Sequence, residues 1–176
     1  MAGRHTGTLT RMTRAGTLEK IGPGRYRLAT STVTENHSLV LACSLVPSSV
    51  VCLSSALLFH NLGTQLFREV WLAVPRGTRA PSFASPPIRV TRITPALFDL
   101  GIEEHRIEGG VVRVYNVVRT VVDCFRFRSK VGLDVAMEAL IEARRSRRLD
   151  LNELDRAAKA LRLDRVMRPY LEMLVA

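Results

Sequence analysis

The sequence predicts an α/β (α+β) chain in which a small helix-and-hairpin module precedes a mixed-sheet domain with C-terminal helices. Three observations predict this class. A short helix and a tight hairpin open the chain, apolar strand-like segments follow, and helical periodicity takes over after residue 116. Hydrophobic residues make up 47% of the 176 residues, which is enough for a packed core. We therefore expect a module over residues 1–30 and a domain over residues 31–176.

The opening helix is expected over residues 5–15. Its spacing places Leu9 and Met12 on one helical face and Arg11 and Arg14 on another. Because threonine has a low helix propensity, this threonine-rich helix needs tertiary support.

The hairpin is expected from two short strands, residues 18–21 and 25–28, joined by a GPG turn at residues 22–24. In the second strand two arginines alternate with Tyr26 and Leu28, so basic and apolar faces separate. A helix followed by a basic hairpin is typical of the second half of a winged helix-turn-helix. We therefore expect a partial winged helix at this end of the chain.

The net charge is +10, from 26 basic and 16 acidic residues, and half of this excess lies in residues 1–30. Such concentration is typical of nucleic-acid binding, and a solvated basic surface is the alternative. In a winged helix, the helix lies in the major groove and the hairpin contacts the flanking backbone. The expected DNA-binding residues are Arg4, Thr8, Arg11, Arg14, Lys20, Arg25 and Arg27.

After a linker at residues 30–36, the chain mixes strand-like and helical segments. Strands are expected at residues 49–53, 69–75 and 88–94, with a loop at 76–87 and a hairpin over 103–116. Helices are expected at residues 34–46, 55–63, 116–128 and 132–148, and one helix or two over residues 151–174. A short helical turn is expected at residues 93–101. The expected helix caps are Ser54, Asn116 and Asp150. The residues expected near one face of the third strand are Ile88, Val90 and Ile93.

Cysteine usage and hydropathy indicate a cytoplasmic protein. Cys43, Cys52 and Cys124 are an odd number in apolar surroundings, which indicates reduced, buried thiols. The polar start of the chain does not resemble a signal peptide, and polar residues interrupt both long apolar segments.

The residues that could carry catalysis or bind a metal form no recognisable motif. Glu103 and His105 share one side of a strand but supply too few ligands for a metal site. His60 is expected to be a hydrogen-bonded histidine of the core or its rim. We expect no catalytic residue, no metal and no cofactor.

Asp123 is the exception, because it interrupts the apolar face of a helix. A buried carboxylate needs a partner, and Arg119 lies one turn before it while Arg126 follows. A structural ion pair is expected, and a charged contact on a partner surface is the alternative.

Four segments in this order carry a resemblance to a known family: GTLEKIGPGRYRLA, VCLSSALLFHNLG, VWLAVPRGTR and VRVYNVVRTVVDCFRFRSKVGLDVAMEAL. Together they resemble the AbiEi family of antitoxins, from type IV toxin–antitoxin systems, from Thr8 to the C-terminus. The most specific segment is VYNVVRTVVDCFRFRSKVGLD. The residues that match the signature of the larger domain are Arg119, Asp123, Phe127, Arg128, Lys130, Gly132 and Asp134.

The resemblance implies a non-enzymatic antitoxin. Its N-terminal winged helix would bind operator DNA and repress its own operon. Its larger domain would counteract a nucleotidyltransferase-type toxin without a stable complex, as a monomer or a weak, DNA-dependent oligomer. A nuclease-like enzyme and a plain DNA-binding regulator with a ligand-sensing domain are the alternatives from other classes.

Members of the family normally carry two helices ahead of the recognition helix, whereas only MAGRH precedes it here. An upstream start or a truncated winged helix would account for this difference.

Overall fold

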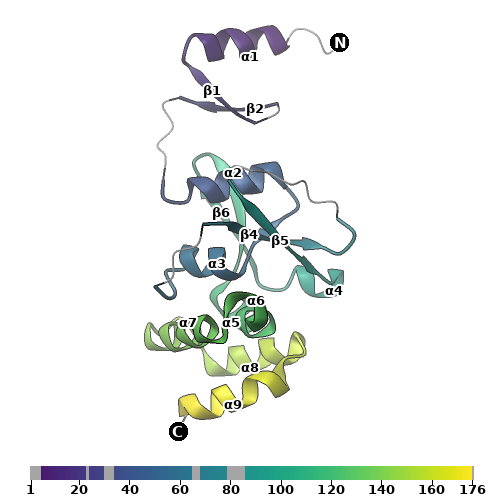
Figure 1. Ribbon diagram of the computed structural model, residues 1–176, viewed down its shortest axis with the longest axis vertical. Coiled ribbons are helices and arrows are strands. Elements are labelled where there is room, and N and C mark those ends of the chain that lie inside the picture. The colour runs from purple at the N-terminus through teal and green to yellow at the C-terminus, as the bar shows by residue number, and fades with distance from the viewer. Residues whose placement is uncertain (1–4, 23, 30–33, 65–67, 79–85, 176) are drawn as a thin grey trace.

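The computed structural model describes residues 5–22, 24–29, 34–64, 68–78 and 86–175. Within these ranges the chain forms nine helices, a two-stranded hairpin and a five-stranded mixed sheet, which confirms the expected α/β class. Figure 1 shows a helix and hairpin at one end, the sheet in the middle and the C-terminal helices at the other end. Some predictions concern residues outside these ranges: Arg4, Pro23 of the turn, residues 30–33 of the linker and residues 79–85 of the loop.

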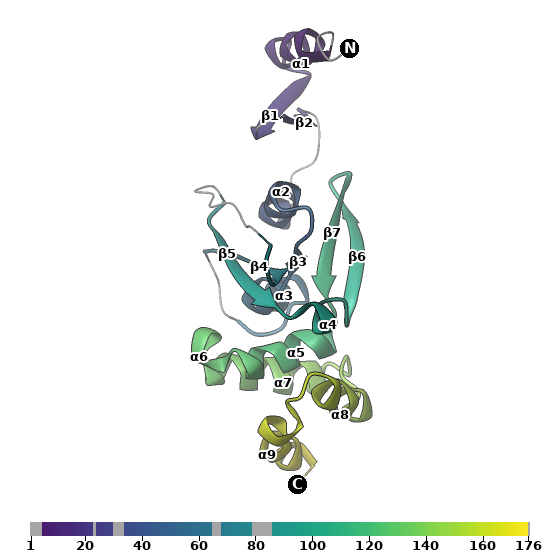
Figure 2. The ribbon, with the colours of Figure 1, turned by 90° about the vertical axis from the view of Figure 1, so that its right-hand side faces the viewer.

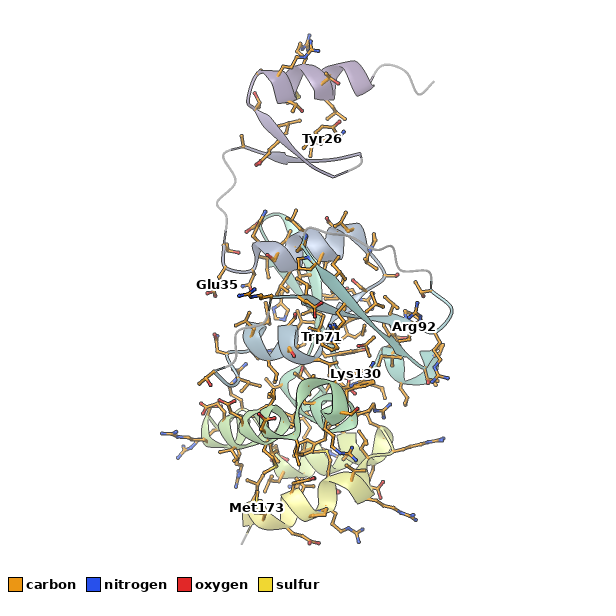
Figure 3. All side chains as sticks on the ribbon, viewed as in Figure 1. Tyr26, Glu35, Trp71, Arg92, Lys130 and Met173 are labelled. Atoms are coloured by element: carbon orange, nitrogen blue, oxygen red, sulfur yellow. The ribbon has the colours of Figure 1, made fainter. Side chains whose placement is uncertain are left out.

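The N-terminal unit forms the expected helix and both expected strands. Its elements are α1 (His5–Arg14), β1 (Leu18–Gly22) and β2 (Arg25–Leu28). The strands pair antiparallel with Leu18 opposite Leu28, and the register shifts between Lys20 and Gly22. In Figure 3, Tyr26 lies between the hairpin and α1. A helix thus packs on a hairpin, while the winged helix itself stays a prediction.

The five-stranded sheet has the order β5-β4-β3-β7-β6. Its strands are β3 (Val50–Val51), β4 (Val70–Pro75), β5 (Ile88–Ile93), β6 (Ile102–Ile107) and β7 (Gly110–Tyr115). β4 pairs in parallel with β5 and antiparallel with β3. β7 pairs in parallel with β3 and forms the expected antiparallel hairpin with β6. The two-residue β3 therefore joins the two halves of the sheet.

The helices of this domain are α2 (His37–Leu45), α3 (Leu53–Phe59), α4 (Pro95–Phe98), α5 (Val117–Arg126), α6 (Arg128–Val131), α7 (Leu133–Arg145), α8 (Leu151–Ala160) and α9 (Asp164–Val175). Two of the expected caps form. Asn116 Oδ1 accepts a hydrogen bond from Arg119 N at 2.8 Å, and Asp150 Oδ1 accepts one from Glu153 N at 2.9 Å.

Helices cover both faces of the sheet because β4 is buried on both sides. Val70, Leu72 and Val74 pack with α2 on one face, whereas Trp71 and Ala73 pack with α3 and α5 on the other. In Figure 2, α2 lies above the strands and α5 and α7 lie below them. Helices α8 and α9 then extend the lower layer. The hydrophobic core on this face of the sheet is therefore shared by the sheet and the C-terminal helices.

Two local expectations are wrong. Ser54 does not cap α3, because the helix already begins at Leu53, whose positive φ of 48° turns the chain out of β3. Ile93 does not share a face with Ile88 and Val90. Since β5 pairs with β4 without a break in register, Ile93 packs into the core on the opposite face of the sheet.

Candidate functional site

The candidate DNA-binding residues lie on the N-terminal unit. Thr8, Arg11 and Arg14 are exposed on α1, and Lys20 is exposed on β1. Arg25 and Arg27 belong to β2, where they pair with Gly22 and Glu19 respectively. The helix and the hairpin thus bring six of the seven expected residues into one small unit, and the seventh, Arg4, is not described.

Strand pairing places Lys20 on the face of the hairpin that carries Tyr26. Lys20 lies opposite Tyr26, and directly opposed residues of an antiparallel pair project from the same face. Lys20 therefore shares the face of Tyr26, which lies toward α1 in Figure 3. Lys20 is exposed all the same, as the long, flexible side chain of a lysine allows.

Among the signature residues of the larger domain, Arg119 and Asp123 form a buried pair on α5. Arg119 Nε donates to Asp123 Oδ2 at 2.7 Å, and both side chains are 2% exposed. Arg119 Nη1 also donates to the main-chain oxygens of Leu97 at 2.7 Å and Leu100 at 2.8 Å. Its guanidinium carbon lies 4.3 Å from the centre of the Tyr115 ring. These contacts connect α5 to the end of α4 and to β7.

Burial raises the pKa of Asp123, and the charge and hydrogen bond of Arg119 oppose this effect. Arg126 Nε lies 3.8 Å from Asp123 Oδ1, and Arg126 Nη2 donates to the main-chain oxygen of Leu161. Gly101 allows the close packing, because a Cβ at this position, where φ is +77°, would lie 2.8 Å from Arg119 Cβ. The expected structural ion pair is confirmed, and Asp123 lies too deep for a partner contact.

The other signature residues surround the turn from α5 to α7. Phe127 is half-buried, and the exposed Lys130 places Nζ 5.3 Å from the centre of its ring. Arg128 donates to a main-chain oxygen of α5 at 2.9 Å. Gly132 has φ +98° at the start of α7, and the exposed Asp134 lies in the first turn of that helix, where a negative charge is favourable. These five residues shape a connection between helices.

Sequence reasoning missed the main-chain partners of the arginines. The carbonyls of Leu97, Leu100 and Leu161 accept hydrogen bonds from Arg119 and Arg126. A main-chain acceptor leaves no signal in residue type, so these contacts could not be predicted from spacing.

His60 is a hydrogen-bonded core histidine, as expected. It is 5% exposed, and Nε2 lies 2.7 Å from the Tyr115 main-chain oxygen while Nδ1 lies 3.4 Å from Arg148 Nη2. A neutral ring with its proton on Nε2 satisfies both contacts. Burial lowers the pKa of His60, the Tyr115 carbonyl opposes this, and Arg148 adds to the lowering.

The structure also describes the side chains considered for metal binding. His105 Nε2 lies 3.5 Å from Glu103 Oε2. Among the residues placed in the structure, no group of three or more His, Cys, Asp or Glu side chains could hold a metal ion. All three cysteines are buried and free, and burial raises the pKa of Cys43 to about 11.

In comparisons with known proteins, no family model matches the chain and no curated protein matches it significantly. In the described part of the chain, every helix is too short or too polar to cross a membrane.

The first prediction concerns the buried pair. Asp123→Asn keeps the side-chain shape but leaves the Arg119 guanidinium buried without a counter-charge, so we expect a loss of about 3–5 kcal/mol in the free energy of unfolding. The matched control is Asp155→Asn, which removes an exposed pair with Lys159 at the same helical spacing and should cost less than about 1 kcal/mol. Urea denaturation measures both, and equal losses would contradict a structural role for Asp123.

The second prediction concerns pH. The pKa of His60 is lowered in the folded state from its ordinary 6.5. Just below pH 6.5, therefore, His60 binds a proton in the unfolded chain but stays neutral in the folded chain. The contribution of neutral His60 to the free energy of unfolding is therefore complete above the ordinary pKa and is lost as the pH falls below it. Denaturation from about pH 8 to about pH 5 should show a decline that is smaller in His60→Gln. If the free energy of unfolding of the variant falls with pH as steeply as that of the parent chain, groups other than His60 cause the fall.

Proposed function

We propose that the chain is a type IV antitoxin that binds the DNA of its own promoter through α1, β1 and β2. The observation that carries the DNA-binding part is the exposed pair Arg11 and Arg14 on α1, beside a hairpin that contributes three further basic residues. Figures 1 and 2 both place this unit at one end of the molecule, clear of the sheet. Cationic side chains on an accessible helix suit phosphate contacts along a groove.

The antitoxin part of the proposal rests on the resemblance to the AbiEi family. In this proposal the α/β domain counteracts a nucleotidyltransferase-type toxin in the cytoplasm without a stable complex. The free thiols of the core suit a reducing compartment. Phe127 and Lys130 support a role beyond folding, because Lys130 is exposed and the Phe127 ring is only half-buried beneath it.

The third prediction tests DNA binding. The double variant Arg11→Gln Arg14→Gln should weaken binding to a duplex from the chain's own promoter. Two lost phosphate contacts should also lower the slope of log K against log salt by about 2. Fluorescence anisotropy over a salt series measures both quantities.

The matched control for this test is Arg162→Gln Arg165→Gln, which removes two exposed arginines from the opposite end of the molecule. We expect its affinity and salt slope to equal those of the parent chain. Equal losses in the two double variants, or no binding even with upstream codons restored, would contradict promoter binding by the N-terminal unit.

The fourth prediction tests the antitoxin function. Co-expression of the chain should restore growth when the adjacent reading frame is induced, and the Arg11→Gln Arg14→Gln variant, expressed from an unrelated promoter, should restore it equally. Growth arrest that the chain does not relieve would favour a plain DNA-binding regulator. Metal-dependent cleavage of nucleic acid by the purified chain would favour a nuclease-like enzyme.

A further inference from the structure

We propose that a cavity beside Trp71 binds a terminal phosphate group, as carried by a free nucleotide or by the end of an RNA strand. The cavity has a volume of about 440 Å³, within the usual range for small-ligand sites. Described residues from four parts of the chain line it, and those that carry the argument are Ser54, Arg68, Glu69, Trp71, Arg89 and Lys130. Figure 3 shows Trp71 and Lys130 close together, where the sheet meets the helical layer.

The charges in this Trp71 cavity leave an unbalanced positive excess. Arg89 Nε contacts Glu69 Oε2 at 2.8 Å, and the Arg89 guanidinium carbon lies 5.0 Å from the centre of the Trp71 ring. Glu69 is thereby committed to Arg89, which it holds in place. Arg68 and Lys130 have no salt-bridge or hydrogen-bond partner among the described residues. Lys130 contacts only the Phe127 ring, so neither of these two cations is neutralised by an acid, and both can contact an anion in the cavity.

Ser54 provides a neutral donor at the same place. It lines the cavity and its residue is 1% exposed, so it lies in the wall of the cavity rather than at its rim. The position of Ser54 is held from both sides. Leu53 has the positive φ of 48°, an uncommon conformation for a leucine, and the Ser55 hydroxyl accepts from Trp71 N at 2.9 Å. Ser54 thus places a hydroxyl-bearing side chain at a fixed position in the wall of a cationic cavity.

A phosphate monoester fits this set better than a single carboxylate. At neutral pH it carries about −1.5 to −2 charge and three strong acceptor oxygens. The free charges of Arg68 and Lys130 balance that charge, and the Ser54 hydroxyl supplies a third donor. The site lies in the α/β domain and involves neither α1 nor the hairpin, so this inference does not depend on promoter binding.

The test is isothermal titration of the full-length chain with inorganic phosphate, AMP, and a short RNA carrying either a 5′-phosphate or a 5′-hydroxyl. We expect saturable binding of AMP and of the 5′-phosphorylated RNA, with competition by inorganic phosphate. Arg68→Gln and Lys130→Gln should each weaken AMP binding by about tenfold, because each removes one charge-assisted contact. Tighter binding of the phosphorylated RNA than of AMP would identify an RNA end, and the reverse a nucleotide.

The controls are Arg76→Gln and Lys159→Gln, which remove one exposed arginine and one exposed lysine that do not line the cavity. Both should bind AMP as the parent does. Ser54→Ala, a small change at a buried position, should also weaken binding. The proposal is wrong if AMP and inorganic phosphate do not bind, if the 5′-hydroxyl RNA binds as tightly as AMP and the 5′-phosphorylated RNA, or if control and cavity variants lose affinity equally. Promoter binding by Arg68→Gln and Lys130→Gln should be unchanged, which separates this test from that of the N-terminal unit.

Discussion

The buried ion pair of Arg119 and Asp123 is the interaction on which the arrangement of the α/β domain depends. A guanidinium that is 2% exposed must find partners for its donors, because an unpaired buried charge is very costly. Nε of Arg119 finds Asp123 on its own helix, and Nη1 finds the carbonyls of Leu97 and Leu100. The guanidinium also lies over the face of the Tyr115 ring, while Nη2 has no hydrogen-bond partner among the described residues. Helix α5 therefore has one position relative to the α4 turn and β7.

This constraint explains why the C-terminal helices form one layer with the sheet. Once α5 is fixed, Val121 and Phe125 lie in the core that α5 shares with the sheet on one side and with α7 and α8 on the other. Phe125 also packs against Tyr170 of α9, with ring centres 4.8 Å apart. The C-terminal helices thus pack against α5, which is itself anchored to the sheet and carries apolar residues on both sides.

A second polar cluster fixes the point where the N-terminal unit joins the domain. Glu108, at the turn of the β6–β7 hairpin, accepts hydrogen bonds from Thr34 N at 2.7 Å and Thr34 Oγ1 at 3.0 Å. Its other oxygen lies 2.6 Å from His37 Nδ1, at the start of α2. The hydrogen bonds from Thr34 and His37 hold the pKa of Glu108 below its ordinary value, against the effect of burial. Whatever the N-terminal unit binds, the chain enters the domain at this anchored position.

Strands, helices and two of three caps could be predicted from the sequence, because hydrophobic period and capping residues are local signals. The Arg119–Asp123 pair was predictable for the same reason, since helical spacing places the two side chains together. The start of α3 was not, because Leu53 adopts a positive φ that its residue type disfavours. The Trp71 cavity was not predictable either. Arg68, Arg89 and Lys130 are far apart in sequence, and they meet only because β4 pairs with β5 and α6 lies at the same place.

The use of arginine in this chain shows why net charge alone is a weak guide to its binding surfaces. In the α/β domain Arg119, Arg126, Arg128 and Arg148 donate to main-chain carbonyls, so their first role is to satisfy acceptors where helices end or turn. Such residues raise the net charge without offering a free binding group. Arg68 and Lys130 differ, because they border a cavity and lack a polar partner among the described residues. The informative quantity is therefore the number of cations that folding leaves unpaired, and in the α/β domain two of them border the Trp71 cavity.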